Sequence, residues 1–326
     1  MRIAFLEDRS WFFTGPRAYR GWIEKALSGR HELGFFNAPP ASGWDILHVL
    51  DVKRVSLETL KPVSIPVVAD VHDHYWAEFA AFPSPDLPLR WLLQKSRRLH
   101  YCRILARASA VIVHARVVAQ YIKHGNLHLV PYGLDLASLA PQRDTRREPI
   151  LLLVGRDCLR KGLPVILKAL GRINQRFPEA RLVVIGDEFW HTRLWAKLLS
   201  RGLPVEFLPG MPFKKVVGWY NRSSVLVLPS YIESFGLTIL EAMAAGLPVV
   251  ASAVGGITEQ IVSGENGFLI RPGDSQDLAE KVIRVLEDKD LREGFVKKGQ
   301  EGLSGRFDLE SMTQKLEQAY QSVFGR

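Results

Sequence analysis

Cysteine and long apolar runs are both scarce in this chain of 326 residues. Its two cysteines form no Cys-x-x-Cys pair, so a disulfide framework is excluded and a reducing compartment is expected. The apolar run before Glu7 is shorter than the roughly 7–15 residues of a signal-peptide core. The uncharged stretch 242–258 is broken by glycine and proline and falls short of the ~20 apolar residues of a membrane span. We therefore expect a cytoplasmic protein, soluble or peripheral on the inner face of the membrane.

Acidic residues are missing from one long segment. Residues 87–134 contain no Asp or Glu, although the whole chain holds 43 basic and 34 acidic residues and a net charge of +9. The segment carries the cations Arg90, Lys95, Arg97, Arg98, Arg103, Arg107, Arg116 and Lys123. A surface of this kind, over residues 87–123, can bind anionic lipid headgroups, and a solvated basic face on a core helix is an equally good interpretation.

Short runs rich in Val, Ile and Leu alternate with helix-like segments. Most of these runs lack a strict apolar–polar alternation, which is typical of strands buried on both faces. The expected strands are 3–6, 46–49, 67–70, 110–113, 127–130, 150–154, 181–185, 205–207, 225–228, 248–251 and 267–270. The expected helices include 19–27, 163–176, 237–245, 277–287 and 309–323. The alternation predicts an α/β protein with parallel, doubly wound sheets.

A polar, charged segment between Pro141 and Pro149 is the best linker in the chain. We expect an N-terminal domain over residues 1–142 and a C-terminal domain over 143–308. The final helical segment, 309–326, could pack back on the first domain. Facing doubly wound domains bring the carboxyl ends of their strands to a shared cleft, where such sheets bind ligands.

The stretch from Ser230 to Gly246 carries the clearest chemical signal. It follows the strand at 225–228 and opens a helix near Gly236, whose free N–H groups can bind a phosphate or sugar oxygen. It also holds Glu233 and Glu241, and a carboxylate can accept hydrogen bonds from the vicinal hydroxyls of a sugar. Two glutamates near a helix, taken alone, are more often simply solvated.

This stretch resembles the E-x7-E signature of retaining glycosyltransferases with the GT-B fold, the large family four. The shared order is Glu233-Ser-Phe-Gly-Leu, Glu241-Ala-Met-Ala-Ala-Gly, Pro248-Val-Val-Ala-Ser and Gly255-Gly256. The resemblance implies two Rossmann-like domains facing a central cleft. It implies that Glu233 contacts the donor sugar and Glu241 the nucleotide ribose. The implied donor-binding loop consists of Ser234, Phe235, Gly236, Leu237 and Thr238.

A second cluster, from Gly155 to Gly162, follows the strand at 150–154. Cations here would stabilise the charge that develops on a nucleoside-diphosphate leaving group. The string resembles the family's G-R-x(n)-K-G element, which implies that Arg156 and Lys161 bind the diphosphate. A triphosphate-binding P-loop does not fit, because position 160 is arginine and Gly162 stands where Ser or Thr should bind magnesium. No G-x-G-x-x-G occurs, which argues against a dinucleotide oxidoreductase.

The N-terminal half offers two further candidates. Gly15 lies in a loop that resembles the family's glycine-rich first loop, which touches the donor phosphates; a simple helix start is an equally good interpretation. His72 follows the strand at 67–70 and resembles the histidine of the family's H-D element, which contacts the transferred sugar. A metal site made of His72, Asp73 and His74 is discounted, because adjacent side chains on a strand point in opposite directions. The resemblance implies no metal and no other cofactor.

The features together predict a retaining glycosyltransferase that moves a sugar from a UDP- or GDP-sugar to an acceptor hydroxyl. The expected acceptor is a glycan or lipid-linked saccharide of cell-surface polysaccharide or glycolipid biosynthesis. The expected catalytic residues are Glu233, His72, Lys161 and Arg156. One alternative is a nucleotide-sugar epimerase of the same fold, which needs no acceptor. A nucleic-acid-binding protein is disfavoured because no binding module is visible, and a glycoside hydrolase would leave the two cations without a role.

Overall fold

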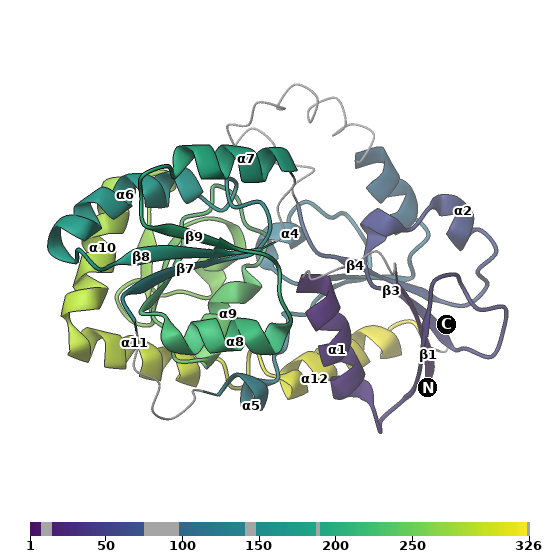
Figure 1. Cartoon of the computed structure of the whole chain (residues 1–326). Helices are drawn as coiled ribbons and strands as arrows, with labels where there is room; N and C mark the ends of the chain where they lie inside the picture. The colour runs from purple at the N-terminus through teal and green to yellow at the C-terminus, as the bar shows by residue number, and fades with distance from the viewer. Residues whose placement is uncertain (8–14, 75–97, 141–147, 187–189, 325–326) are drawn as a thin grey trace. The chain divides into compact units, whose positions relative to one another are not determined.

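The computed structural model describes residues 1–326 except 8–14, 75–97, 141–147, 187–189 and 325–326 (Figure 1). The chain forms two compact units, one of residues 1–134 with 305–326 and one of residues 135–304. Both boundaries precede those expected at 142 and 308. Within the described ranges, no helix combines the length and the apolar character needed to cross a membrane.

The first unit is built on a six-stranded sheet in the order β2-β1-β3-β4-β5-β6, and all of its pairings are parallel. Its strands are β1 Arg2–Leu6, β2 Glu32–Phe36, β3 Ile46–Val49, β4 Val67–Val71, β5 Ala110–Val113 and β6 Leu127–Leu129. Its helices include α1 Gly15–Leu27, η1 Val52–Arg54, α2 Leu57–Leu60, α4 Arg116–Ala119 and α12 Leu309–Gln321. Strands β1, β3, β4 and β5 are almost wholly buried and form the core, because helices cover both faces of such a sheet.

The second unit repeats this plan with the order β12-β11-β10-β7-β8-β9, again all parallel. Its strands are β7 Ile150–Val154, β8 Arg181–Ile185, β9 Val205–Leu208, β10 Val225–Leu228, β11 Val249–Ser252 and β12 Phe268–Ile270. Its helices are α5 Leu136–Leu139, α6 Leu163–Arg176, α7 Trp190–Leu199, α8 Phe213–Arg222, α9 Leu237–Ala244, η3 Gly255–Glu259, α10 Ser275–Glu287 and α11 Lys289–Glu301. The prediction of parallel, doubly wound α/β sheets is confirmed.

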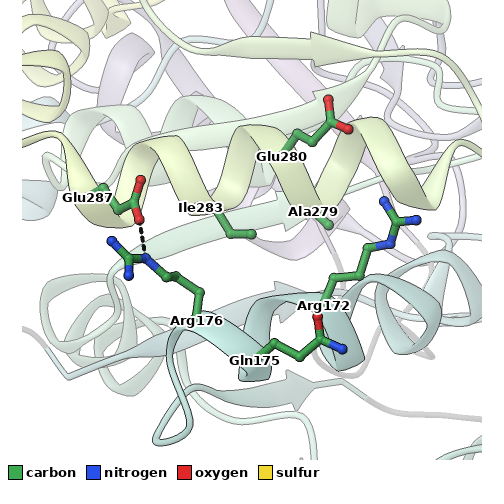
Figure 2. Close-up of a pocket in the computed structure, with 7 residues that line it drawn as sticks. All are labelled: Arg172, Gln175, Arg176, Ala279, Glu280, Ile283 and Glu287. Carbon is green, nitrogen blue, oxygen red and sulfur yellow. Dashed lines mark hydrogen bonds and ion pairs between the residues drawn. The ribbon is translucent and has the colours of Figure 1, made fainter.

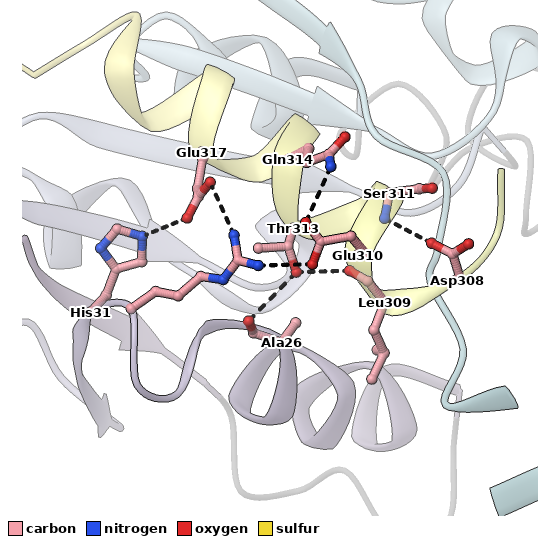
Figure 3. A network of polar contacts seen from close by, with 10 residues as sticks. Ala26, His31, Asp308, Leu309, Glu310, Ser311, Thr313, Gln314 and Glu317 are labelled. Atoms are coloured by element: carbon pink, nitrogen blue, oxygen red, sulfur yellow. Dashed lines mark hydrogen bonds and ion pairs between the residues drawn. The ribbon is translucent and has the colours of Figure 1, made fainter. Parts of the chain in front are cut away.

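Helix α12 comes from the end of the chain and completes the first unit (Figure 3). Asp308 caps its N-terminus by accepting from the Ser311 N–H at 2.7 Å. Just after α1, the Arg30 guanidinium lies 2.7 Å from the Glu310 carboxylate and 3.5 Å from that of Glu317. Inside, the Tyr320 hydroxyl is 2.8 Å from Nδ1 of His48 on β3, so the helix also reaches the sheet.

Candidate functional site

The turn between β7 and α6 is shaped by glycine. Gly155 has φ 126° and Gly162, the N-cap of α6, has φ 86°, conformations that favour glycine. A Cβ on Gly155 would overlap the side chain of Lys161, and one on Gly162 would overlap the backbone oxygen of Pro229. Both glycines are therefore needed for the lysine to lie against the turn and for the turn to approach the loop after β10.

The loop after β10 leads into α9 at Gly236, which has φ 89°. No side chain caps this helix, and its first turn holds no acidic residue. Because the first N–H groups of a helix have no intrahelical partner, α9 offers donors and a partial positive charge to an anion. The loop is backed by η3, where a Cβ on Gly255 would overlap the backbone oxygen of Glu233.

These two segments bring Lys161 and Glu233 together. The lysine Nζ lies 3.1 Å from Oε2 of Glu233, and only 9% and 8% of the two side chains are exposed. The same carboxylate oxygen lies 3.7 Å from the guanidinium of Arg160. Arg160 also donates to the Ile232 carbonyl at 2.9 Å, which ties the turn to the loop. Two cations thus surround one buried carboxylate at the carboxyl ends of β7 and β10.

Arg160 was not among the predicted site residues. Only its position beside Lys161 pointed to it, because Arg160 contacts Ile232, 72 residues further along the chain, and the neighbouring Glu233. Arg156, which was predicted, is exposed on the same turn. The structure therefore places the two predicted cations differently, one buried against Glu233 and one at the surface.

Glu241 is buried on α9 and accepts a hydrogen bond from the Tyr220 hydroxyl of α8 at 2.6 Å. Burial raises the pKa of Glu241 to about 6, although the Tyr220 hydrogen bond and the charge of Lys161 act in the opposite direction. The carboxylate is thus held in place and is still mostly ionised at pH 7. Tyr220 was not predicted, because α8 itself was not predicted.

The remaining predicted loop residues lie where the loop joins α9. Ser234 and Phe235 are buried, and Leu237 and Thr238 are partly exposed in the first turn of the helix. Gln260 donates to the Phe235 carbonyl at 2.6 Å and holds the loop from behind. This support fixes the loop backbone independently of any ligand.

The two N-terminal candidates belong to the first unit. Gly15 is the first residue of α1. His72 follows β4, with its Nδ1 2.5 Å from the Tyr132 hydroxyl and its Nε2 hydrogen-bonded to the Leu50 carbonyl. Its ring also stacks on His114, with ring centroids 4.8 Å apart and an interplanar angle of 9°. Both ring nitrogens of His72 are thus engaged within its own unit.

Asp70, on β4, is fully buried close to three histidines. His48 Nε2 lies 2.8 Å from one carboxylate oxygen, and His114 Nε2 lies 3.9 Å from the other. Burial opposes ionisation of Asp70, but the pairing with His48 and the nearby His114 and His72 together outweigh it, so the pKa of Asp70 is lowered. Burial and the neighbouring His72 lower the pKa of His114 to about 3, so this ring is neutral. The group therefore contains an ionised aspartate beside a neutral His114.

Asp70, His72 and His114 were not proposed together as ligands, yet one ligand atom of each lies within 4.8 Å of the others. The rings of His72 and His114 are nearly parallel, and imidazole lone pairs lie in the ring plane, so they do not converge on one ion. Hydrogen bonds also occupy His72 on both sides. The arrangement fits a hydrogen-bonded core better than a metal centre, and the metal-independence of the reaction stays a prediction.

An open surface pocket of about 700 Å³ lies elsewhere in the second unit, between α6 and α10 (Figure 2). Arg176 and Glu287 form an ion pair of 2.6 Å across it. Its walls also contain Arg172, Gln175 and Glu280. None of the predicted site residues lines this pocket, and its mixed charges select no obvious ligand.

A profile of the family described as "Glycosyl transferases group 1" matches residues 140–302, which include every predicted site residue of the second unit. The D-inositol 3-phosphate glycosyltransferase of Corynebacterium jeikeium (strain K411) is 32% identical over 225 residues, covering 61% of this chain and 54% of that protein. The chain spans about half the length of the first curated relatives that it matches.

Two solved structures share the fold. Sucrose-phosphate synthase from Thermosynechococcus elongatus superposes with a TM-score of 0.82 at 22% identity, covering 99% of each chain. Anabaena Alr3699/HepE, in complex with UDP-glucose, superposes with a TM-score of 0.78 at 20% identity, covering 99% of this chain and all of that one. At this identity the likeness establishes the two-sheet fold alone.

Proposed function

Because this chain belongs to the group 1 glycosyltransferases, we propose that it moves a sugar from a nucleoside-diphosphate sugar to an acceptor hydroxyl with retention of anomeric configuration. The observation that carries the proposal is the buried Lys161–Glu233 pair beside the uncapped N-terminus of α9. The cation and the N–H donors match the diphosphate of such a donor, and the carboxylate matches its sugar hydroxyls.

In this proposal the turn between β7 and α6 stabilises the leaving diphosphate. Lys161 Nζ is fixed by Glu233 and Gly155, so little reorganisation is needed when negative charge develops on the phosphate. Arg156 is exposed on the same turn and would contact the outer phosphate when the donor binds. Arg160 acts as a positioning residue, because it holds the Ile232 carbonyl and the Glu233 carboxylate.

Glu233 and Glu241 then have separate tasks. Glu233 would accept hydrogen bonds from hydroxyls of the transferred sugar, with the backbone of residues 234–238 holding sugar and phosphate. Glu241 has one carboxylate oxygen bonded to Tyr220, so the other is available to a ribose hydroxyl. The solved complex of Alr3699/HepE with UDP-glucose makes UDP-glucose the first donor to test.

We also propose that His72 contacts the transferred sugar, which requires a change in its hydrogen bonds. Since both ring nitrogens are engaged, one of the bonds to Tyr132 or Leu50 would have to be exchanged for the sugar hydroxyl. No metal or cofactor is assigned a part in this scheme.

The acceptor side of the proposal remains an anionic or lipid-linked saccharide at a membrane surface. It rests on the basic segment 87–123, of which residues 87–97 lie outside the described ranges. In the described part, Arg98, Arg103, Arg107 and Lys123 are exposed. Co-sedimentation with anionic liposomes should be lost in Arg97→Ser/Arg98→Ser if this segment binds the membrane.

The test of the donor site is a thermal-shift panel of nucleoside diphosphates and their sugars. A donor at 100 times its dissociation constant should stabilise the protein by about 2.7 kcal/mol. Lys161→Ala should abolish the shift, whereas Lys168→Ala, an exposed lysine on α6, should preserve it. A shift that survives in Lys161→Ala would contradict the site, and conversion of donor without any acceptor would favour an epimerase.

A further inference from the structure

Helix α7 turns its small residues inward and its large apolar residues outward. Thr192, Ala196 and Ser200 recur every four residues and are 5%, 0% and 7% exposed. Leu194, Trp195, Leu198 and Leu199 are 61%, 50%, 57% and 48% exposed. The usual surface helix of a globular protein has the opposite arrangement, with its apolar stripe facing the core.

The four outward residues form one continuous stripe. Their spacing, i, i+1, i+4 and i+5, places them on one side of a helix, and α7 is about 15 Å long at 1.5 Å per residue. The other large apolar side chains that are exposed in the described ranges are Leu99, Val262 and Phe324, which are far from one another in sequence. Single exposed apolar residues are ordinary, whereas a contiguous stripe marks an interaction site.

Cations accompany the stripe. Arg193, Lys197 and Arg201 are exposed and alternate with the apolar residues. None of the three forms an ion pair with a residue whose position is described. Between Phe189 and Val205 the sequence has no acidic residue; Asp187 and Glu188, just before α7, lie outside the described ranges. The face is therefore apolar at its centre and positive at its edges.

We propose that α7 docks the second unit on an anionic phospholipid surface. Leucine and tryptophan side chains would enter the boundary between headgroups and acyl chains, and the arginine and lysine side chains would extend to the lipid phosphates. A second copy of the chain fits less well, because a symmetric contact would set two positive faces against each other. Helix α7 belongs to the second unit and segment 87–123 to the first, and binding of α7 to lipid depends on neither the donor nor the proposed reaction.

The experiment uses the full chain and sucrose-loaded vesicles of phosphatidylcholine with about one third phosphatidylglycerol, sedimented at physiological salt. The expected result is binding to these vesicles and little binding to pure phosphatidylcholine. Leu194→Ser/Leu198→Ser and, separately, Arg193→Ser/Lys197→Ser should each weaken the partition coefficient at least about tenfold. Val262→Ser, which removes an equally exposed apolar side chain elsewhere in the second unit, should bind like the wild type.

Other outcomes overturn the proposal. These are no binding to the anionic vesicles, binding that the α7 variants leave unchanged, or loss of binding only in Arg97→Ser/Arg98→Ser. A concentration-dependent dimer that Leu194→Ser/Leu198→Ser dissociates would assign the stripe to a second copy instead. The side chains substituted on α7 and at Val262 are exposed, so an unchanged thermal midpoint should show that these variants are folded. Donor-induced thermal shifts, measured on the same samples, report on the proposed function separately.

Discussion

Replacing Lys161 by methionine should separate the structural and the catalytic parts of the buried ion pair. Methionine keeps most of the stem that lies against Gly155 and removes the ammonium group 3.1 Å from Glu233. Breaking a buried pair by removing one partner typically costs about 3–5 kcal/mol, because the other charge is left uncompensated. Arg160 remains 3.7 Å from the same oxygen, so we expect the lower end, about 3 kcal/mol, in the free energy of unfolding.

The double variant Lys161→Met/Glu233→Gln tests this explanation. It leaves no buried charge without its partner, so its unfolding free energy should return to within about 1 kcal/mol of the wild type. Its turnover should not return, because the cation that faces the leaving diphosphate is still missing. Removing one preorganised electrostatic contact of this kind typically lowers turnover by about 10²–10³.

Urea denaturation at fixed pH gives the free energies, and release of nucleoside diphosphate from the donor gives turnover. Lys168→Met is the matched control, since that lysine is exposed on the neighbouring helix and should leave both quantities unchanged. A double variant no more stable than Lys161→Met would refute the ion-pair argument. A Lys161→Met protein that keeps near-normal turnover would refute the assignment of Lys161 to the leaving group.

Three further predictions concern pH and backbone geometry. Burial raises the pKa of Glu241 from 4.5 to about 6, so its contribution to stability falls as the pH rises through this window. Glu241→Gln should therefore raise the unfolding free energy at pH 7.5 by about 1–2 kcal/mol while weakening donor binding, as urea denaturation and calorimetry will measure; equal stability at pH 7.5 would contradict it. The pKa of His114 is lowered from 6.5 to about 3, so stability present above pH 6.5 is lost on acidification. This His114 effect alone should cost about 2 kcal/mol between pH 7 and pH 5, against a gain of about 1 kcal/mol from Glu241. In urea denaturation the wild type should therefore lose about 2 kcal/mol more than His114→Asn over this range, and an equal pH dependence of the two proteins would contradict the prediction. Gly255→Ala should abolish donor-induced thermal shifts because its Cβ would overlap the backbone oxygen of Glu233, whereas Gly264→Ala, with φ 86° and open space around it, should cost about 1 kcal/mol and retain them.

The sheets were predictable because their central strands carry a local signal. A strand covered on both faces is a nearly continuous run of Val, Ile and Leu, as in Ile150–Val154. The edge strand β2, Glu32–Phe36, was missed because its side chains are exposed or half-buried and its sequence holds a glycine. Helix α7 was missed for a related reason, since its large apolar residues face outward and do not mark a core.

Only those site residues that lie in a local sequence motif could be predicted. Lys161 and Glu233 were each chosen for their own neighbourhood, and the structure adds the contact between them. The contact of Arg160 with Glu233 and the hydrogen bond from Tyr220 to Glu241 join separate segments of the chain, so no local pattern contains them. The engagement of both nitrogens of His72 likewise depends on Leu50 and Tyr132, which the fold alone brings to it.

The return of α12 to the first unit has a consequence for synthesis on the ribosome. Residues 135–304 form one uninterrupted unit, which can fold as soon as they have left the exit tunnel. The first unit is made earlier but lacks Tyr320 beside His48 and the glutamates beside Arg30 until α12 emerges. The segment translated first should therefore be the last to reach its native packing, and until then it would expose the surface of α1 and β3 that α12 later covers.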